Sequence, residues 1–262
     1  MPAAFFLARP SPNPHLMEET PSIPAATLVT VRERPGRPPE LLMVERAQGM
    51  AFAGGALVFP GGRIDPSDRL AGGTDEAAAR VAAIRETVEE TAIPAGLSPV
   101  PNRAQALALQ EALLEERDFA ELLGELGVEL DLDALTPFAR WVPKFHAARR
   151  FDTLFFLARA PGPDWEPNVV EGECSGACWI SAKEALERDR TGSARLIFPT
   201  RRNLERLALH QSFEAMVADA LAHPVAPITP WVEEVDGENF ITIPEDAGYP
   251  IVREKLDGLW RG

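Results

Sequence analysis

One strongly two-sided helix, predicted between Asp75 and Ile93, does most to limit how this chain can fold. Thr74 or Asp75 supplies its N-cap, and acidic residues follow in the first turn. One stripe of the helix is apolar and consists of Ala77, Val81, Ile84 and Val88. A stripe of this kind has to be buried, so we expect the helix to lie against a sheet.

The opposite side of the same helix carries three carboxylates, Glu86, Glu89 and Glu90, at positions i, i+3 and i+4. On an exposed helix their repulsion costs about 0.2–0.5 kcal/mol per pair. A hard cation such as magnesium would offset this cost, because it prefers oxygen ligands and commonly joins carboxylates to phosphates. Taken alone, however, the cluster favours a plainer interpretation, a solvated acidic face on which Arg85 pairs with Glu89.

Strand-like runs precede this helix. Residues Ala25–Arg32 and Leu41–Arg46 flank the turn-rich stretch RERPGRPPE, which predicts a hairpin. A third strand is predicted at Gly54–Phe59, ending at Pro60, Gly61 and Gly62, where the backbone can turn sharply. The stretch DPSDRLAGGTDE is then expected to form a loop that leads into the helix.

Helical composition returns at 103–127, which we interpret as a helical insertion. The sheet is expected to resume at Phe138–Val142, Thr153–Ala158 and Ala177–Ile180. Further helices are expected at Ala182–Arg190 and Thr200–Ala222. In the tail, Asp236 and Gly237 stand between two extended stretches and predict a hairpin. These boundaries predict a leader at 1–22, a main domain at 23–222 and a C-terminal extension at 223–262 packed on it.

Composition narrows the classes of partner. With 40 acidic and 26 basic residues, the net charge of −14 disfavours a nucleic-acid partner. An acidic protein can still bind small phosphorylated ligands if bound cations supply the positive charge that contacts the phosphate. No apolar run reaches the roughly 18 residues that a membrane span needs. Cys174 and Cys178 have no second pair of ligands nearby for zinc, so we expect reduced thiols and a cytoplasmic protein.

The stretch FPGG, followed by a helix that contains RETVEE, resembles the Nudix box over Phe59 to Ile93. That motif usually runs glycine, a glutamate six residues on, then REUxEExGU, where U is apolar. The resemblance implies an α/β fold, a Nudix-type α/β/α sandwich with a mixed sheet, here with a helical insertion and a C-terminal extension. It also implies Mg²⁺ or Mn²⁺ and attack of water on a diphosphate.

Carried over position by position, the resemblance makes Arg85 the residue that orients the glutamates. It makes Glu86 and Glu90 the principal metal ligands and Glu89 a further ligand, while Gly61 or Gly62 positions the loop or offers a carbonyl to the metal. The chain departs from the motif at three points: Ala92 stands for the usual glycine, Thr87 for an apolar residue, and the loop before Arg85 is longer. Counting back from Arg85 places Ala77 where the first glutamate belongs, with Glu76 as an imperfect substitute one residue away.

Segments outside the box resemble the Nudix branch that includes peroxisomal coenzyme A diphosphatases: LLMVERAQGMAFAGGALVFPGG, RRFDTLFFLA, GECSGACWISAKEAL and FPTRRNLERLA. The resemblance implies cleavage of coenzyme A or acyl-coenzyme A to 3',5'-ADP and a 4'-phosphopantetheine product. Hydrolysis of ADP-ribose, NADH or a dinucleoside polyphosphate is the alternative within enzymes. A Nudix-shaped binding module without turnover is the alternative outside them. The sequence predicts no particular oligomeric state.

Other residues carry weaker signals. Arg149 and Arg150 are expected to bind substrate phosphate, or else to form ordinary ion pairs. Arg46, at a strand end, resembles a family position close to substrate and is otherwise a surface cation. Glu173 is a candidate for metal binding or water activation, and Glu171 competes for that role. Glu86, Glu89 and Glu173 are the candidates for the general base.

One histidine and several aromatic residues favour structural roles over catalytic ones. His146 is the histidine nearest the predicted site, where a neutral imidazole could accept a proton, but a satisfied structural residue is the commoner case. Four aromatic residues are expected in the core rather than around a nucleobase, namely Phe52, Phe59, Trp141 and Trp179.

Overall fold

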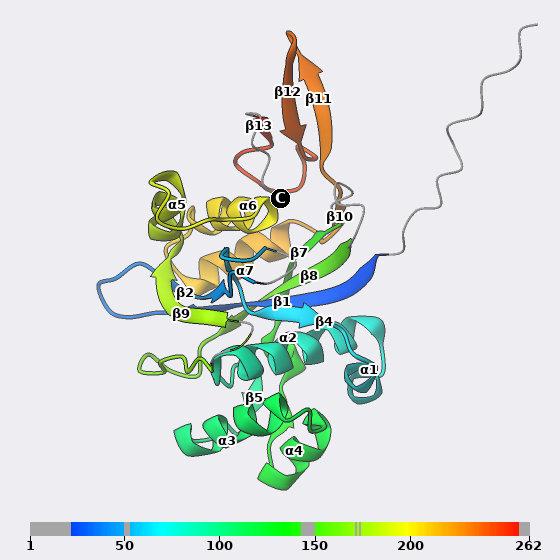
Figure 1. Cartoon of the computed structure of the whole chain (residues 1–262), viewed down its shortest axis with the longest axis vertical. Helices are drawn as coiled ribbons and strands as arrows, with labels where there is room; N and C mark the ends of the chain where they lie inside the picture. The colour runs from blue at the N-terminus through cyan, green and yellow to red at the C-terminus, as the bar shows by residue number, and fades with distance from the viewer. Residues whose placement is uncertain (1–21, 50–52, 143–149, 171, 173, 257–262) are drawn as a thin grey trace, which may run out of the picture.

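The computed structural model describes residues 22–49, 53–142, 150–170, 172 and 174–256, and in them one eight-stranded mixed sheet carries helices on both faces (Figure 1). The strands are β1 (Ile23–Arg32), β2 (Glu40–Arg46), β3 (Leu57–Val58), β4 (Gly61–Arg63), β7 (Thr136–Trp141), β8 (Phe151–Arg159), β9 (Cys174–Ser181) and β10 (Pro227–Ile228). They lie in the order β10-β7-β8-β1-β2-β3, while β4 pairs with β1 and β9 with β2. The predicted fold class is confirmed.

Strand β1 organises the sheet. It runs parallel to β8, from the pair Ile23 and Phe151 to the pair Val31 and Arg159, and antiparallel to β2 and β4. Every residue from Ala25 to Arg32 is buried. A continuous buried run is typical of a strand covered on both faces, whereas a strand with one wet face alternates.

The pleat of β1 divides the core into two layers, because successive side chains point to opposite faces. Leu28 belongs to the apolar cluster that includes helix α2 (Asp75–Thr91). Its neighbour Val29 belongs to the cluster on the other face, which includes α6 (Phe198–Leu207) and α7 (Phe213–Ala222). Helices therefore cover both faces of the sheet, as an α/β/α sandwich requires.

Helix α2 is buried on more than its predicted stripe. Val81, Ile84 and Val88 are buried as expected. Alanines on other faces of the helix are also fully buried: Ala78, Ala79, Ala82 and Ala83. Their small side chains let neighbouring elements approach closely, and helix α3 (Arg103–Leu114) packs beside α2. Besides the exposed first turn of α2, its carboxylate face stays partly accessible.

The insertion forms two helices, α3 and α4 (Phe119–Leu126), with α4 following after a short break. Asn102 caps α3, since its side chain accepts from the Gln105 N–H while the Gln105 side chain accepts from the Asn102 N–H. Asp118 caps α4, and Gly127 ends it in the left-handed conformation. The two short strands β5 (Leu97–Ser98) and β6 (Glu129–Leu130) pair with each other at the base of the insertion.

The segment before α2 differs from the expectation. The strand predicted at Gly54–Phe59 is limited to β3, and extended structure resumes at β4, where the glycines pair with β1. The stretch expected as a loop contains helix α1 (Pro66–Gly72). Asp65 forms a capping box with Asp68, and Pro66 occupies the first turn, where its missing N–H costs nothing.

Most elements after the insertion match their predictions. Strands β7, β8 and β9 lie at the three predicted positions, and α5 (Ala182–Arg190) is confirmed. The single helix expected at Thr200–Ala222 is wrong, because α6 ends at Leu207 and α7 begins after Ser212, whose side chain caps it. None of the described helices combines the length and apolar character needed to cross a membrane.

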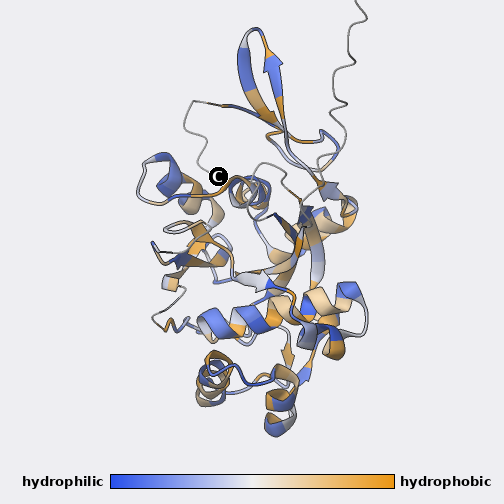
Figure 2. Ribbon diagram, turned by 45° about the vertical axis from the view of Figure 1, so that its right-hand side comes forward, coloured by the Kyte–Doolittle hydropathy of each residue, from blue (hydrophilic) through white to orange (hydrophobic). Residues whose placement is uncertain are grey.

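The tail forms a separate antiparallel sheet of β11 (Trp231–Val235), β12 (Glu238–Thr242) and β13 (Arg253–Lys255). The predicted hairpin turn is confirmed: Asp236 and Gly237 have φ of 54° and 80°, as a two-residue turn of this kind requires. The hairpin extends away from the main sheet and carries both hydrophobic and hydrophilic residues (Figure 1 and Figure 2). Beyond it, Ile243 and Tyr249 are buried in the same cluster as α6 and α7.

Candidate active site

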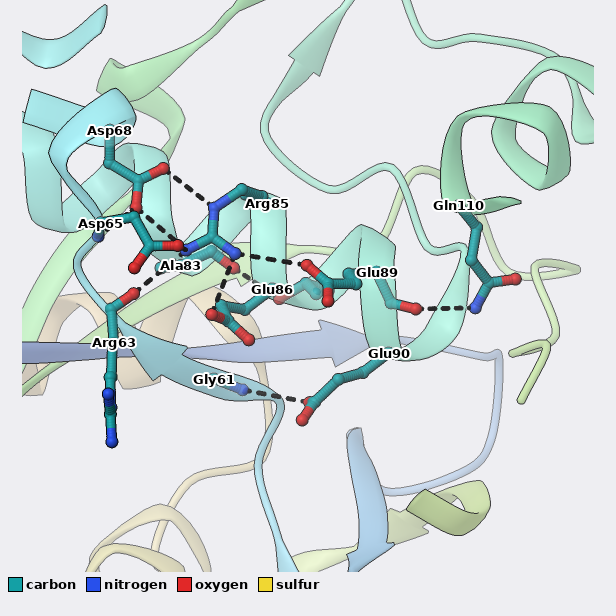
Figure 3. Close-up of polar contacts among 11 residues, drawn as sticks. Gly61, Arg63, Asp65, Asp68, Ala83, Arg85, Glu86, Glu89, Glu90 and Gln110 are labelled. Carbon is teal, nitrogen blue, oxygen red and sulfur yellow. Dashed lines mark hydrogen bonds and ion pairs between the residues drawn. The ribbon is translucent and has the colours of Figure 1, made fainter. Parts of the chain in front are cut away.

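The glutamate face of α2 lies against β4, and Figure 3 shows Glu90 beside Gly61 of that strand. The backbone N–H of Gly61 donates to Oε2 of Glu90 at 3.2 Å. A Cβ atom on Gly62 would lie closer than 3.0 Å to both carboxylate oxygens of Glu86. A side chain at position 62 would therefore have to displace the Glu86 carboxylate.

Arg85 donates hydrogen bonds to several groups of the site. Its Nε and Nη2 atoms each donate to one oxygen of Asp68 at 3.0 Å, which makes a bidentate pair. Nη1 donates to Glu86 Oε1 at 3.0 Å and to Glu89 Oε2 at 3.3 Å. Nη2 also donates to the carbonyl of Arg63 at 3.1 Å, which ties the helix to β4. One guanidinium thus fixes α1, β4 and two of the glutamates at once.

The charges of the site affect one another. Burial raises the pKa of Glu86 to about 7, and the negative charge of Glu89 adds to this shift while Arg85 opposes it. For Arg85, burial lowers the pKa, but the hydrogen bonds that it donates to Asp68 and the charges of the surrounding carboxylates outweigh burial and raise the pKa above its ordinary value. Asp65 is a fourth carboxylate around this guanidinium, with Oδ2 at 3.5 Å from Nη2.

The donor set fits a hard divalent cation. Glu86 and Glu90 bring carboxylate oxygens to the backbone of β4, and magnesium often uses only one or two carboxylates together with water and phosphate. Within the described ranges, no three acidic, histidine or cysteine side chains already converge as a metal-binding group. A site of two carboxylates completed by water and substrate is compatible with both observations.

Two of the three departures from the motif have local explanations. Thr87 is fully buried, and its hydroxyl donates to the Ala83 carbonyl at 2.7 Å, so the helix itself satisfies the polar group. Ala92 caps α2 in the left-handed conformation with φ of 53°, where a glycine would be strain-free. Its N–H still donates to the Val88 carbonyl at 2.7 Å, so the helix ends where the motif predicts.

The sequence prediction missed Asp68 and offered Glu76 for the first acidic position of the motif. Glu76 is exposed and pairs with Arg80, not with Arg85. Asp68 is 1% exposed and takes the place of the carboxylate that holds the arginine. The signal was present, because Asp68 lies six residues after Gly62, the spacing of the motif counted forward. Counting backward from Arg85 failed because the extra residues lie between Asp68 and the helix.

The remaining predicted site residues fall at strand ends or outside the described ranges. Arg46 is the last residue of β2, and its carbonyl accepts from the Gly55 N–H at 2.9 Å. Arg150 directly precedes β8, and its carbonyl accepts from the Ile23 N–H at 2.7 Å. The expectations that lie outside the described residues concern Phe52, His146, Arg149, Glu171 and Glu173.

Three of the four aromatic residues can be compared with their prediction. Phe59 and Trp141 are buried in the core, as expected. Trp179 is half-buried, and the guanidinium of Arg32 lies 4.4 Å from its ring centroid, while its Nε1 donates to the Trp165 carbonyl. This packing is that of a structural residue.

Comparison with known proteins shows similarity to Nudix proteins. Residues 21–109 match the family model described as NUDIX domain. A Caenorhabditis elegans protein, provisionally named nudix hydrolase 7, is 28% identical over 77% of this chain and 66% of its own length. The human acyl-coenzyme A diphosphatase NUDT19 is 26% identical over 76% of this chain and 69% of its own. This chain thus spans about two thirds of each relative.

A solved structure is similar over most of the chain. The crystal structure of a NUDIX hydrolase from Alicyclobacillus acidocaldarius aligns with a TM-score of 0.68 and 29% sequence identity. The alignment covers 76% of this chain and 96% of that one. The similarity therefore extends well beyond the glutamate helix.

Proposed function

We propose that this chain, whose residues 21–109 match the NUDIX domain model, is a Nudix hydrolase that uses a divalent metal to hydrolyse a nucleoside diphosphate derivative. The observation that carries the proposal is the fit between β4 and α2. Glu86 fills the space beside Gly62, and Glu90 accepts from the Gly61 N–H. This arrangement leaves carboxylate oxygens directed at a glycine backbone that a diphosphate can approach closely.

In this proposal Glu86 and Glu90 hold Mg²⁺ or Mn²⁺, Glu89 is a further ligand, and Gly62 of β4 offers its backbone carbonyl to the metal. Arg85 acts on the glutamates by the hydrogen bonds described above, and Asp68 holds Arg85 in turn. When bound, the metal would neutralise the diphosphate and lower the pKa of the attacking water. The proton of that water would pass to Glu86, Glu89 or Glu173.

For the substrate, we propose coenzyme A or an acyl-coenzyme A, cleaved to 3',5'-ADP and a 4'-phosphopantetheine product. Similarity to the human acyl-coenzyme A diphosphatase over 76% of this chain supports this choice. Arg46, Arg149 and Arg150 are the proposed phosphate contacts, since arginine matches phosphate geometry well. ADP-ribose, NADH and dinucleoside polyphosphates are the competing substrates.

The test is a substrate panel with purified protein and Mg²⁺ or Mn²⁺, in which products are identified by mass. The panel contains coenzyme A, acyl-coenzyme A, ADP-ribose, NADH and dinucleoside polyphosphates. Release of 3',5'-ADP from the coenzyme A compounds supports both the chemistry and the substrate. Cleavage of another compound alone keeps the hydrolase and discards the substrate, whereas metal binding without turnover identifies a binding module.

A further inference from the structure

In the last turn of α2, the carbonyls of Glu89 and Thr91 accept hydrogen bonds from outside the helix. A helix leaves its final carbonyls unpaired, and other groups must satisfy them. After Glu90, the residue that would donate to its carbonyl is Pro94, which has no N–H. The N–H of Ile93 donates to the hydroxyl of Thr91 at 3.3 Å instead of continuing the helix. The carbonyl of Glu89 therefore needs a donor from elsewhere.

Gln110, on helix α3 of the insertion, supplies that donor (Figure 3). Its Nε2 donates to the Glu89 carbonyl at 2.9 Å and to the Asn168 carbonyl at 3.0 Å. Its Oε1 accepts from Asn168 Nδ2 at 2.7 Å. Gln110 is 1% exposed, so both amide hydrogens and the amide oxygen are used in a buried setting.

Asn168 completes the connection. Its backbone N–H donates to the Thr91 carbonyl at 2.8 Å, which satisfies a second carbonyl at the end of α2. The same connecting segment between β8 and β9 contacts α3 again, because Arg103 donates to the Glu166 carbonyl and lies 5.7 Å from the Trp165 ring. The insertion therefore holds the end of α2 and this segment together.

We propose that Gln110 is a positioning residue for the hydrolytic site, acting through the backbone of Glu89 and through Asn168. The inference rests on the proposed function, because Glu89 and Glu90 are the carboxylates whose turn Gln110 fixes. Without its amide, the partly buried carbonyls of Glu89 and Asn168 lose the donor that Gln110 supplies, and the turn that carries two proposed ligands shifts. The helical insertion thereby has a role in the chemistry and not only in covering α2.

The variant that tests this is Gln110→Met, which keeps a long side chain but removes every hydrogen bond. The matched control is Gln105→Met on the same helix, since the side chain of Gln105 caps α3 through its hydrogen bond with Asn102. Asn168→Ala is the reciprocal variant. Three quantities are measured for each protein: kcat and KM on the best substrate of the panel, affinity for Mn²⁺, and amide hydrogen exchange of the metal-free protein.

For Gln110→Met we expect kcat and Mn²⁺ affinity to fall about tenfold to hundredfold, with a smaller change in KM. Amide exchange should rise at the end of α2 and at Asn168. Gln105→Met should lose a similar amount of thermal stability and keep its kcat and Mn²⁺ affinity. The double variant of Gln110 and Asn168 should be no worse than Gln110→Met alone, because the two residues act as one unit.

Unchanged kcat and Mn²⁺ affinity in Gln110→Met, with an active parent protein, would overturn the positioning role and leave the proposed function intact. Equal losses in the Gln105 control would also overturn it, since they would reflect general loosening of the insertion. If the parent protein cleaves nothing in the panel, the proposed function fails by itself. Mn²⁺ affinity and amide exchange would still decide whether Gln110 positions the carboxylates.

Discussion

Two charge clusters in this molecule are built from similar residues but are balanced differently. In the α2 cluster, a single guanidinium, that of Arg85, is shared among four carboxylates, those of Asp65, Asp68, Glu86 and Glu89. In the α6 cluster, Arg201 and Arg202 pair with three carboxylates, those of Asp189, Glu205 and Glu254. Burial raises the pKa of one glutamate in each cluster, Glu86 and Glu205, to about 7.

The difference lies in what surrounds the raised carboxylate. Glu86 shares its arginine with other acids and lies against bare glycine backbone, which suits a cation brought in from solution. Glu205 lies beside Arg202, and the arginines of α6 also pair with Glu254 of β13, which joins helix to tail. The α2 cluster therefore has one guanidinium for four carboxylates, whereas the α6 cluster has two guanidinium groups for three carboxylates.

Among the variants that test the comparison of the α2 and α6 clusters, Glu90→Gln should have the largest effect. We expect turnover to fall about a thousandfold, at the upper end of what loss of one electrostatic contact to a transition state costs, while the fold is kept. Glu76→Gln is the control, because Glu76 is exposed and pairs only with Arg80 among the contacts described. Steady-state kinetics and circular dichroism measure both. Full activity of Glu90→Gln would remove the metal assignment.

Asp68→Ala should have the next largest effect. It leaves Arg85 buried without its bidentate partner, and breaking a buried pair in this way costs about 3 kcal/mol or more of unfolding free energy. Activity should fall as well, because Arg85 no longer holds Glu86 and Glu89. Urea denaturation measures the loss, and Glu254→Gln in the α6 cluster is the comparison. A smaller loss for Asp68→Ala than for Glu254→Gln would contradict the structural importance of Asp68.

Substitutions at the two glycines of β4 should affect turnover and stability differently. Gly62→Ala meets the flexible end of Glu86, so we expect a stable protein whose turnover falls about tenfold to hundredfold as that carboxylate is displaced. Gly61→Ala meets the carbonyl of Ala26 and the Cα of Thr27, so the strands themselves must move and stability should fall. Thermal unfolding and kcat distinguish the two. Normal turnover in Gly62→Ala would mean that Glu86 need not occupy this space.

Glu205 should give the smallest effect, a change in how stability depends on pH. Its folded pKa of about 7 lies above the ordinary value of 4.5, so the folded state holds this proton more tightly than the unfolded state. The stability contribution is complete below about pH 4.5 and is lost as the pH rises toward 7. Glu205→Gln should flatten that part of the curve, as measured by urea unfolding at pH 5 to 8. Parallel curves for both proteins would show that Glu205 titrates normally.

Local sequence predicted the parts of the site that local geometry controls. The spacing of Glu86, Glu89 and Glu90 places them on one helical face whatever the rest of the chain does. The hairpin at Asp236 and Gly237 was likewise predictable, because two residues with positive φ specify the turn. The break between α6 and α7 was missed, although Ser212 carries an ordinary N-cap signal.

What the sequence determined by itself is therefore the glutamate helix and most of the strands and helices around it, since these follow from side-chain periodicity, while the mixed-sheet sandwich was implied by the family resemblance. Only the tertiary structure decided that Asp68 holds Arg85 across the inserted residues, because the folding of α1 sets that distance. Only it joined Gln110 to Asn168, 58 residues away. Such pairs form between polar groups that only tertiary packing brings together, so no local sequence pattern predicts them.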